Sequence, residues 1–351
     1  MYQPLTPDLP LLEAVRSIES SFCRIAVVTD QDNKVIGTLT DGDVRRCLLN
    51  GGNMSTAVAE AMAKNPITAL PETPDNILIN LLHNHNILAV PIVDRGGHLV
   101  KILHMRDLLE SDSFQILTSF ESAVIMAGGE GTRLRPLTET IPKPMVSVGG
   151  VPLLERQINQ LLKHGIKRVY LSVNYLGHII EDHFADGNSF GLDIRYLREE
   201  SKLGTAGSLS LLPEQPSRPI LVINGDILTS CDFLGLYDFH VNTMASVTIA
   251  ASEYNLRIPY GIVECDGARL ISLTEKPSQR FLCNTGIYAL SPAILSMIPY
   301  LVQYNMTDLI ASCLSEGKPV SVFPIHEFWS DIGTPSDLAK ARNLFSAHHD
   351  A

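Results

Sequence analysis

A glycine-rich run directly after a short apolar segment constrains the fold of this chain more than any other feature. Residues 126–138 read Met-Ala-Gly-Gly-Glu-Gly-Thr-Arg-Leu-Arg-Pro-Leu-Thr, and Pro-Lys-Pro-Met follows at residues 142–145. The preceding Ala-Val-Ile, residues 123–125, is typical of a buried strand. Glycine permits positive φ angles and close backbone approach, so the N–H groups of such a turn can surround phosphates. The run therefore predicts a phosphate-binding loop at the end of a strand.

The spacing excludes two better-known phosphate loops, because neither Gly-x-x-x-x-Gly-Lys-Ser/Thr nor Gly-x-Gly-x-x-Gly is present here. The whole run, with its basic tail, resembles the nucleotide signature of the sugar-1-phosphate nucleotidyltransferases (nucleoside-diphosphate-sugar pyrophosphorylases). The resemblance implies two sets of residues. The nucleotide contacts would come from Ala127, Gly128, Gly129, Gly131 and Thr132, and the catalytic cations would be Arg133 and Lys143.

Composition limits the classes of protein that remain. The 351 residues favour two or three domains, and the net charge of −11 without a Lys/Arg cluster argues against nucleic-acid binding or a membrane-surface role. No apolar run approaches the roughly 18 residues of a membrane span, and the N-terminus lacks a signal-peptide pattern. Six scattered cysteines without Cys-x-x-Cys spacing indicate reduced thiols rather than a disulfide framework or zinc site. These features together favour a cytoplasmic protein.

The second part of the chain, residues 122–351, alternates strand and helix patterns. Strands are predicted at residues 169–173, 194–197, 220–223, 245–251 and 286–290, and helices at residues 153–164 and 179–184. Such alternation indicates βαβ units, hence a Rossmann-like α/β fold with a mixed, mostly parallel sheet. Ligands in these sheets lie beyond the carboxyl ends of the strands, where the glycine-rich run is expected.

A diverged repeat occupies the first part of the chain. Residues 24–46 and 88–109 each read as a β-hairpin entering a helix, and a further helix is predicted at Asp75–His85. Asp30 and Asp94 are 64 residues apart, and so are Asp43 and Asp107. A long unit present twice indicates two similar modules packed together.

This region resembles a tandem pair of cystathionine-β-synthase-type (CBS) repeats, at about residues 1–56 and 57–115, which would form a smaller α+β module ahead of the catalytic domain. Residues 111–121 would link the two parts. The resemblance implies a regulatory nucleotide site at Thr40, Asp43 and Asp107. The alternative is that Thr40 caps the helix that follows it. His104 replaces the threonine in the second repeat, which favours at most one nucleotide per chain, and the module could instead serve only in assembly.

Two aspartates are candidate ligands of Mg²⁺. Asp226 ends the apolar strand Leu-Val-Ile-Asn-Gly-Asp, where a carboxylate beside a nucleotide requires a cation. Asp331 lies in Trp-Ser-Asp-Ile-Gly-Thr-Pro, residues 329–335. By themselves these residues could form a turn and a helix cap, whereas the resemblance implies that both hold the metal.

Further motifs follow in the order that the family resemblance implies. Glu275 and Lys276 match its sugar-phosphate motif, and Gly261, Asn284 and Thr285 match positions lining the sugar pocket. Gly204 and Thr205 match the segment along the nucleobase. Just before it, Glu199 and Glu200 could accept the N1–H and N2–H₂ donors of guanine, which favours GTP. Each motif alone could be a solvated loop.

The implied reaction converts a nucleoside triphosphate and a sugar 1-phosphate into a nucleoside-diphosphate sugar and pyrophosphate. The CBS pair ahead of the catalytic domain resembles the architecture of glucosamine-1-phosphate guanylyltransferases of bacterial legionaminic acid synthesis, which favours GTP and glucosamine 1-phosphate. Mannose-1-phosphate or heptose-1-phosphate guanylyltransferase and glucose-1-phosphate uridylyltransferase are alternatives. A non-catalytic nucleotide sensor is an alternative of another class. A homo-oligomer is expected.

Overall fold

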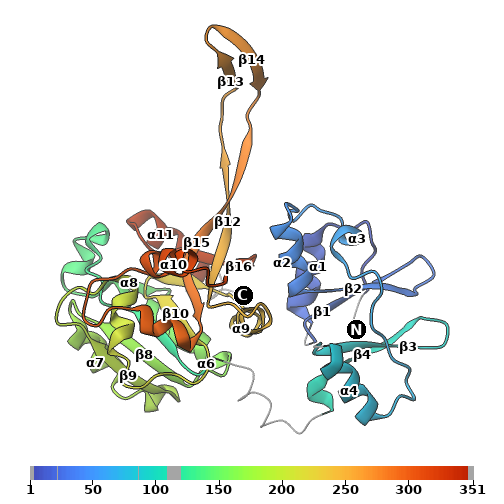
Figure 1. Ribbon diagram of the computed structural model, residues 1–351, viewed down its shortest axis with the longest axis horizontal. Helices are drawn as coiled ribbons and strands as arrows, with labels where there is room; N and C mark the ends of the chain where they lie inside the picture. Colours follow the sequence, from blue (N-terminus) through green and yellow to red (C-terminus); the bar gives the residue numbers. More distant parts are fainter. Residues whose placement is uncertain (1–3, 22, 86, 109–119, 347–351) are drawn as a thin grey trace. The chain divides into compact units, whose positions relative to one another are not determined.

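The computed structural model describes residues 4–21, 23–85, 87–108 and 120–346 (Figure 1). The chain folds as two compact units, Met1–Leu117 and Thr118–Ala351. Most of the predicted linker, residues 111–121, lies outside the described residues.

The first unit contains two hairpin modules. The elements of the first are α1 (Leu11–Ser20), β1 (Ile25–Thr29), β2 (Val35–Thr40), α2 (Asp41–Leu49) and α3 (Val58–Ala61). Those of the second are α4 (Asp75–His85), β3 (Ala89–Val93), β4 (Leu99–His104) and the 3₁₀ turn η1 (Met105–Asp107).

The two modules repeat one another in detail. Each hairpin is antiparallel, and its register shifts at equivalent positions, between Val28 and Thr29 and between Ile92 and Val93. In each hairpin turn an aspartate Oδ1 accepts a backbone N–H four residues later at 2.9 Å, from Lys34 to Asp30 and from His98 to Asp94. The predicted internal repeat is thereby confirmed.

The second unit is built on a seven-stranded sheet in the order β16-β12-β15-β10-β5-β8-β9. Its strands are β5 (Ala123–Met126), β8 (Arg168–Val173), β9 (Asp193–Arg198), β10 (Ile220–Asn224), β12 (Val247–Arg257), β15 (Ser278–Leu290) and β16 (Val320–Ile325). Only β15 runs antiparallel to its neighbours in this sheet. The predicted mixed, mostly parallel α/β fold is confirmed.

Helices cover both faces of this sheet. They are α6 (Leu153–Lys163), α7 (Gly177–Phe184) and α9 (Phe233–Asn242) on one face, and α8 (Gly204–Gly207) and α10 (Met306–Ser315) on the other. Helix α11 (Pro335–Ser346) packs in a separate apolar cluster with Val148 and Leu228, outside this sheet. One core contains Ile158 of α6 and Phe233 of α9, and the other contains Leu309 of α10. Among the described residues, no helix has the length and hydrophobicity needed to cross a membrane.

Two pairs of short strands form small sheets of their own. Strand β6 (Ser147–Val148) pairs with β7 (Val151–Pro152), and β11 (Ile227–Thr229) pairs with β17 (Trp329–Asp331). The 3₁₀ turns are η2 (Thr132–Leu134), η3 (Leu137–Glu139), η4 (Lys143–Met145), η5 (Asn188–Phe190), η6 (Ser208–Leu211) and η7 (Pro292–Met297).

Strands β12 and β15 continue far beyond the sheet as a two-stranded ribbon (Figure 1). The ribbon ends in the hairpin of β13 (Ile262–Asp266) and β14 (Arg269–Thr274). We call residues 253–282 the arm. The sequence predicted strands only at residues 245–251 and 286–290, because the polar residues beyond them do not form a buried strand; here the antiparallel partner extends both strands.

Candidate active site

The candidate site lies where the parallel strands end, as the sequence predicted. The glycine-rich loop follows β5, and its Ala127 N–H donates to Ser172 O at 2.9 Å. The Gly225 N–H donates to Met126 O at 2.9 Å, and a Cβ on Gly225 would lie 2.7 Å from that oxygen. Glycine at position 225 is therefore required for the loop after β10 to meet the glycine-rich loop.

Gly131 fixes the shape of the loop. Its φ of 63° is in the left-handed region, and a Cβ there would lie 2.9 Å from Lys143 Cβ and 3.0 Å from Thr138 Cγ2. The Thr138 hydroxyl donates to Gly131 O at 2.8 Å. Gly129, by contrast, has no atom within 4 Å of a Cβ position, so its backbone is open to a ligand.

Gly131→Ala is expected to lower the midpoint of thermal unfolding more than Gly191→Ala. Both glycines have positive φ, at 63° and 74°, but only at Gly131 does an added Cβ meet another residue. We expect about 1–2 kcal/mol of destabilisation from backbone strain at either site, and a further loss at Gly131 because Lys143 must move. Differential scanning calorimetry of the two variants measures this difference, and equal losses would contradict the packing of Gly131 against Lys143.

Lys143, Asp226 and Asp331 form a compact charged cluster. Lys143 is buried, its ammonium donates to Asp226 Oδ2, and Nζ lies 3.9 Å from Asp331 Oδ1. Asp226 and Asp331 are brought together by two contacts of the backbone. Strand β11, directly after Asp226, pairs with β17, which ends at Asp331, and the Ile332 N–H donates to Asp226 O at 2.9 Å. Residues separated by more than 180 positions thus meet at one point.

Arg133 adds a second cation beside this cluster. A Cβ on Gly333 would lie 3.3 Å from both Arg133 Nη1 and Asp331 Oδ2, so the guanidinium and the carboxylate share the space next to this glycine. Burial raises the pKa of Asp331, the negative charge of Asp226 raises it further, and Lys143 and Arg133 oppose the shift. The two carboxylates are crowded and depend on nearby positive charge.

The carboxylate pair fits a divalent cation. Asp331 Oδ1 is buried and accepts no hydrogen bond. The alternative that Asp331 caps α11 does not hold, because the Thr334 N–H donates to Asp337 Oδ2 at 3.0 Å. Within the described part of the chain, no three or more His, Cys, Asp or Glu residues form a metal-binding group. Two carboxylates completed by water and substrate phosphates are typical of Mg²⁺ sites.

Glu199 lies next to the glycine-rich loop but is already hydrogen-bonded. Its Oε1 accepts from the Ser172 hydroxyl, and its Oε2 accepts from the Leu203 N–H at 2.9 Å. A Cβ on Gly128 would lie 3.1 Å from Oε1. Glu200 is exposed. The carboxylate of Glu199 thus holds the following segment in place, and each oxygen retains one further lone pair for a ligand.

Gly204 and Thr205 join the same segment to α10. A Cβ on Gly204, whose φ is 79°, would lie 2.7 Å from Asn305 Oδ1. The Thr205 hydroxyl accepts the Met306 N–H at 2.9 Å. Both residues therefore hold this segment against the start of α10, in addition to the contact with the nucleobase that the sequence predicted.

The predicted sugar residues divide into two groups. At the base of the arm, the buried Thr285 donates to Ala250 O at 2.7 Å, and its carbonyl accepts the Trp329 indole N–H at 2.9 Å. Asn284 donates to the Tyr288 hydroxyl at 2.9 Å.

The second group consists of Gly261, Glu275 and Lys276, which lie on the arm and are exposed. A Cβ on Gly261 would lie 2.8 Å from Glu275 Oε2, so these two residues are neighbours there. The structure does not bring this group to the charged cluster of the same chain.

Comparison with known proteins places this site in a family. The family model described as nucleotidyl transferase matches residues 122–347, and that described as CBS domain matches residues 3–50 and 58–113. The chain belongs to the nucleotidyl transferase family. The tandem CBS repeats suggested by the sequence are likewise confirmed.

Several relatives of this nucleotidyl transferase are mannose-1-phosphate guanylyltransferases. The protein from Mycobacterium tuberculosis is 31% identical over 226 residues, covering 62% of this chain and 62% of that protein. The catalytic subunit beta from Danio rerio is 35% identical over 225 residues, again with 62% of each chain covered. The chain thus spans about 62% of the length of these curated relatives.

Among solved structures, the crystal structure of HddC from Yersinia pseudotuberculosis is similar, with a TM-score of 0.51 and 27% identity. The match covers 64% of this chain and all of HddC. A second structure of HddC, complexed with GMP-PN, matches equally well.

The structure adds polar residues to this nucleotidyl transferase site that the sequence did not reveal. Gln157 of α6 is buried and donates to Asn224 O at 2.9 Å and Ile227 O at 2.7 Å, which fixes the loop bearing Asp226. Asn174 donates to Glu199 O at 2.7 Å. Two sequence features could have indicated these positioning residues. One is a glutamine on the apolar face of α6, and the other is an asparagine directly after β8.

The predicted regulatory residues act as helix caps. Asp43 Oδ2 accepts from the Thr40 N–H at 2.8 Å and from its hydroxyl at 2.7 Å, and the Arg46 guanidinium donates to Oδ1. Asp107 accepts the His104 N–H at 2.9 Å in the second repeat. Each aspartate therefore caps the helical turn that follows its hairpin.

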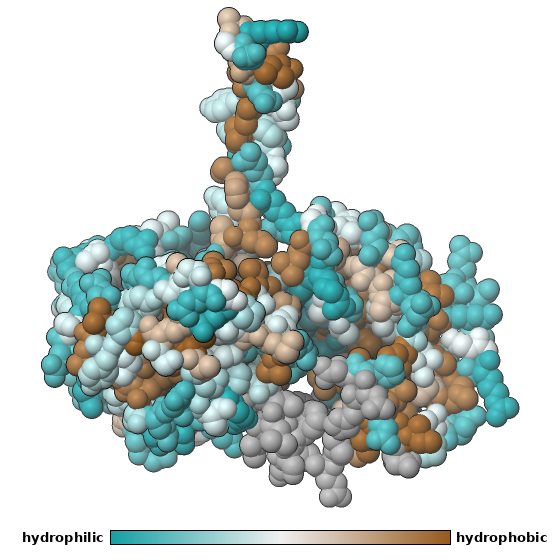
Figure 2. Space-filling view, in the orientation of Figure 1, coloured by the Kyte–Doolittle hydropathy of each residue, from teal (hydrophilic) through white to brown (hydrophobic). Residues whose placement is uncertain are grey.

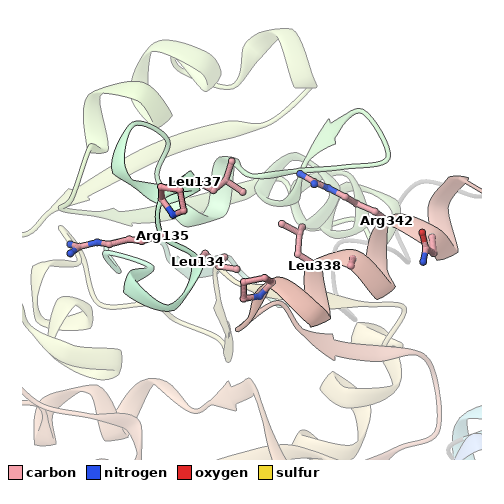
Figure 3. Close-up of a pocket in the computed structure, with 9 residues that line it drawn as sticks. Leu134, Arg135, Leu137, Leu338 and Arg342 are labelled. Atoms are coloured by element: carbon pink, nitrogen blue, oxygen red, sulfur yellow. The ribbon is translucent and has the colours of Figure 1, made fainter.

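A separate cavity of about 400 Å³ lies behind the glycine-rich loop (Figure 3). Leu134 and Leu137 line it from the loop side, and Leu338 and Arg342 line it from α11. None of the predicted substrate residues lines this cavity. It belongs to the contact between the loop and α11 rather than to the candidate active site.

Proposed function

We propose that this chain transfers a nucleotidyl group from a nucleoside triphosphate to a sugar 1-phosphate, releasing pyrophosphate. The observation that carries this proposal is the cluster of Lys143, Asp226 and Asp331 beside Arg133 and the glycine-rich loop, in a member of the nucleotidyl transferase family. The carboxylates can bind a cation, and the two basic residues can neutralise phosphates.

In this reaction a phosphate oxygen of the sugar 1-phosphate bonds to the α-phosphorus, and the bond from that phosphorus to the bridging oxygen of the β-phosphate breaks. The attacking oxygen is already an anion near neutral pH, so no general base is required. Catalysis then rests on positioning and on neutralising charge. Lys143 would contact the transferred phosphate, Arg133 the leaving pyrophosphate, and Lys276 the phosphate of the sugar.

Asp226 and Asp331 would hold Mg²⁺. Bound there, Mg²⁺ would neutralise phosphate charge and orient both substrates. Lys143 contacts Asp226 and lies near Asp331, so it already holds positive charge between these carboxylates. Substrate phosphates would draw its ammonium away from Asp226.

We propose guanine as the base. The relatives described above are guanylyltransferases, and the HddC complex contains GMP-PN. The exposed carboxylate of Glu200 and the remaining lone pairs of Glu199 could accept guanine donors. Glutamate at both positions would disfavour a base that presents acceptors on that edge.

Separate observations favour two sugars. The names of the relatives favour mannose 1-phosphate. The tandem CBS repeats ahead of the catalytic domain favour glucosamine 1-phosphate, because this architecture resembles the glucosamine-1-phosphate guanylyltransferases. Heptose 1-phosphate and glucose 1-phosphate complete the set to be tested.

Pyrophosphate release tests this proposal with the full chain and Mg²⁺. ATP, CTP, GTP, UTP and dTTP are each combined with the 1-phosphates of glucosamine, mannose, glucose and heptose. We expect release with GTP and one of the first two sugars, and a lower apparent affinity for GTP in Glu200→Gln. Release with UTP or dTTP would retain the reaction but remove the glutamates as guanine contacts. Binding of GTP without release across the panel would support the nucleotide sensor.

We also propose that the CBS repeats bind a regulatory nucleotide near Thr40, Asp43 and Asp107. The family match supports this assignment. Because Asp43 caps α2 through Thr40, a nucleotide bound there would share these hydrogen bonds, and its binding would act on the start of the helix.

A further inference from the structure

Within the described part of the catalytic unit, the strands of the arm pair with no strand outside the arm. Strand β12 pairs with β16 only as far as Ser252, and beyond that point β12 and β15 pair only with each other. At the tip, β13 and β14 form a two-stranded sheet of their own. An isolated two-stranded ribbon is marginally stable in water and usually requires a surface to pack against.

The arm also exposes apolar side chains, which Figure 2 shows along its length. Val263 pairs with Leu273, so these two residues share one face, and Ile271 lies beside them at the register shift of β14. Their exposed fractions are 60%, 62% and 60%. The other large apolar residues exposed on the arm are Tyr254, Leu256, Tyr260, Ile262, Leu270, Phe281 and Leu282. Ten large apolar side chains exposed on one projecting element indicate an interaction site.

The arm separates two halves of the proposed active site. Thr285, at its base, is joined to Trp329 and so lies near Asp331. Lys276 lies just before Ser278, the first residue of β15, and Ser278 precedes Asn284 at the base by six positions, which corresponds to roughly 20 Å along an extended strand. This length is several times that of a lysine side chain, and the ribbon projects away from the sheet (Figure 1).

A second copy of the chain is the partner that fits these observations. Each copy carries Lys143, Asp226 and Asp331, which form the part of the proposed active site that lies far from Lys276 of the same chain. Residues 253–282 carry four acidic and four basic side chains, so the arm is neutral while the whole chain has a net charge of −11. A neutral arm can approach an acidic body without the repulsion that two bodies would experience. Mutual exchange of arms gives a closed two-fold dimer.

We propose that the arm docks on the catalytic unit of a second copy and supplies Lys276 to the sugar phosphate bound there. Each of the two active sites in the dimer then combines Asp226 and Asp331 of one chain with Lys276 of the other. This inference rests on the proposed nucleotidyl transfer for its catalytic part, while the docking of the arm can be tested separately.

Complementation between two inactive variants tests the shared site. Full-length Lys276→Ala and Asp226→Asn chains with different affinity tags are co-expressed, and the mixed dimer is purified through both tags. Exchange predicts one complete site per mixed dimer, hence about half the wild-type turnover and on the order of 100-fold more than either variant alone. A mixed dimer as inactive as its parents would show that the arm serves its own chain and would overturn the proposal.

Sedimentation velocity tests the docking without relying on catalysis. Leu273→Glu places a charge on the apolar face of the arm and is expected to raise the dimer dissociation constant at least tenfold. Met244→Glu is the matched control, because Met244 is 84% exposed, lies outside the arm, and should leave the constant unchanged. A monomeric wild type, or a dimer unaffected by Leu273→Glu, would overturn the arm exchange. An inactive wild type whose dimer depends on Leu273 would contradict the proposed function and retain the docking.

Discussion

Asp226→Asn is expected to lower turnover by about 10³-fold or more while leaving the fold intact. Asparagine has nearly the same shape, but it removes the negative charge that contacts Lys143 and would bind the cation beside Asp331. The backbone hydrogen bond from Ile332 N–H to Asp226 O does not depend on the side chain. Pyrophosphate release at saturating substrate measures the loss, and circular dichroism confirms the fold.

Asp182→Asn is the matched control for this variant. Asp182 is exposed on α7 and lies outside the charged cluster, so its substitution should leave turnover unchanged. Near-normal activity in Asp226→Asn would contradict the assignment of Asp226 to the cation site. Equal losses in both variants would attribute the effect to a general change in charge.

Lys143→Met is expected to have the second-largest effect, a loss of about 10²–10³-fold in turnover. Methionine retains much of the buried volume but removes the ammonium that contacts Asp226. The positive charge of Lys143 lowers the pKa of Asp331, so its removal raises that pKa further. A carboxyl group whose pKa is higher in the folded than in the unfolded protein destabilises the fold at pH above its folded pKa, and protonation removes this penalty.

The variant therefore has a specific pH signature. Its midpoint of thermal unfolding should fall below that of the wild type at pH 8, and the difference should narrow as the pH is lowered towards 5. Lys163→Met, at an exposed position on α6, should show no such pH dependence. A constant difference between pH 5 and 8 would indicate that Lys143 contributes volume rather than charge.

The parts of the fold that depend on local pattern were predictable from the sequence. Residues 75–85 form the expected helix, and the strand predicted at residues 169–173 differs from β8 by one residue. The apolar runs that end at Met126 and Asn224 are parallel neighbours in the sheet, so Asp226 was correctly expected at its carboxyl edge. The strands among these features follow from the burial of their segments on both faces of the sheet.

Features that depend on a distant partner were not predictable. The length of the arm is set by the pairing of β12 with β15, whose outer residues include polar side chains on both strands. The carboxylate of Glu199 can be recognised as a positioning group only when Ser172 and Leu203 are seen beside it. Likewise, Thr40 and Asp43 have the same spacing whether they cap a helix or bind a nucleotide, and only the hydrogen bonds show the capping.

The measurement that tests the central claim most directly is the fate of labelled oxygen in the sugar phosphate. Wild-type protein is incubated with Mg²⁺, GTP and the active hexose 1-phosphate, whose non-bridging phosphate oxygens carry ¹⁸O, and the products are analysed by mass spectrometry. Attack of the sugar phosphate on the α-phosphorus predicts that all of the label remains in the GDP-sugar and none enters pyrophosphate. Label in pyrophosphate, or pyrophosphate release without a GDP-sugar, would contradict the proposed transfer.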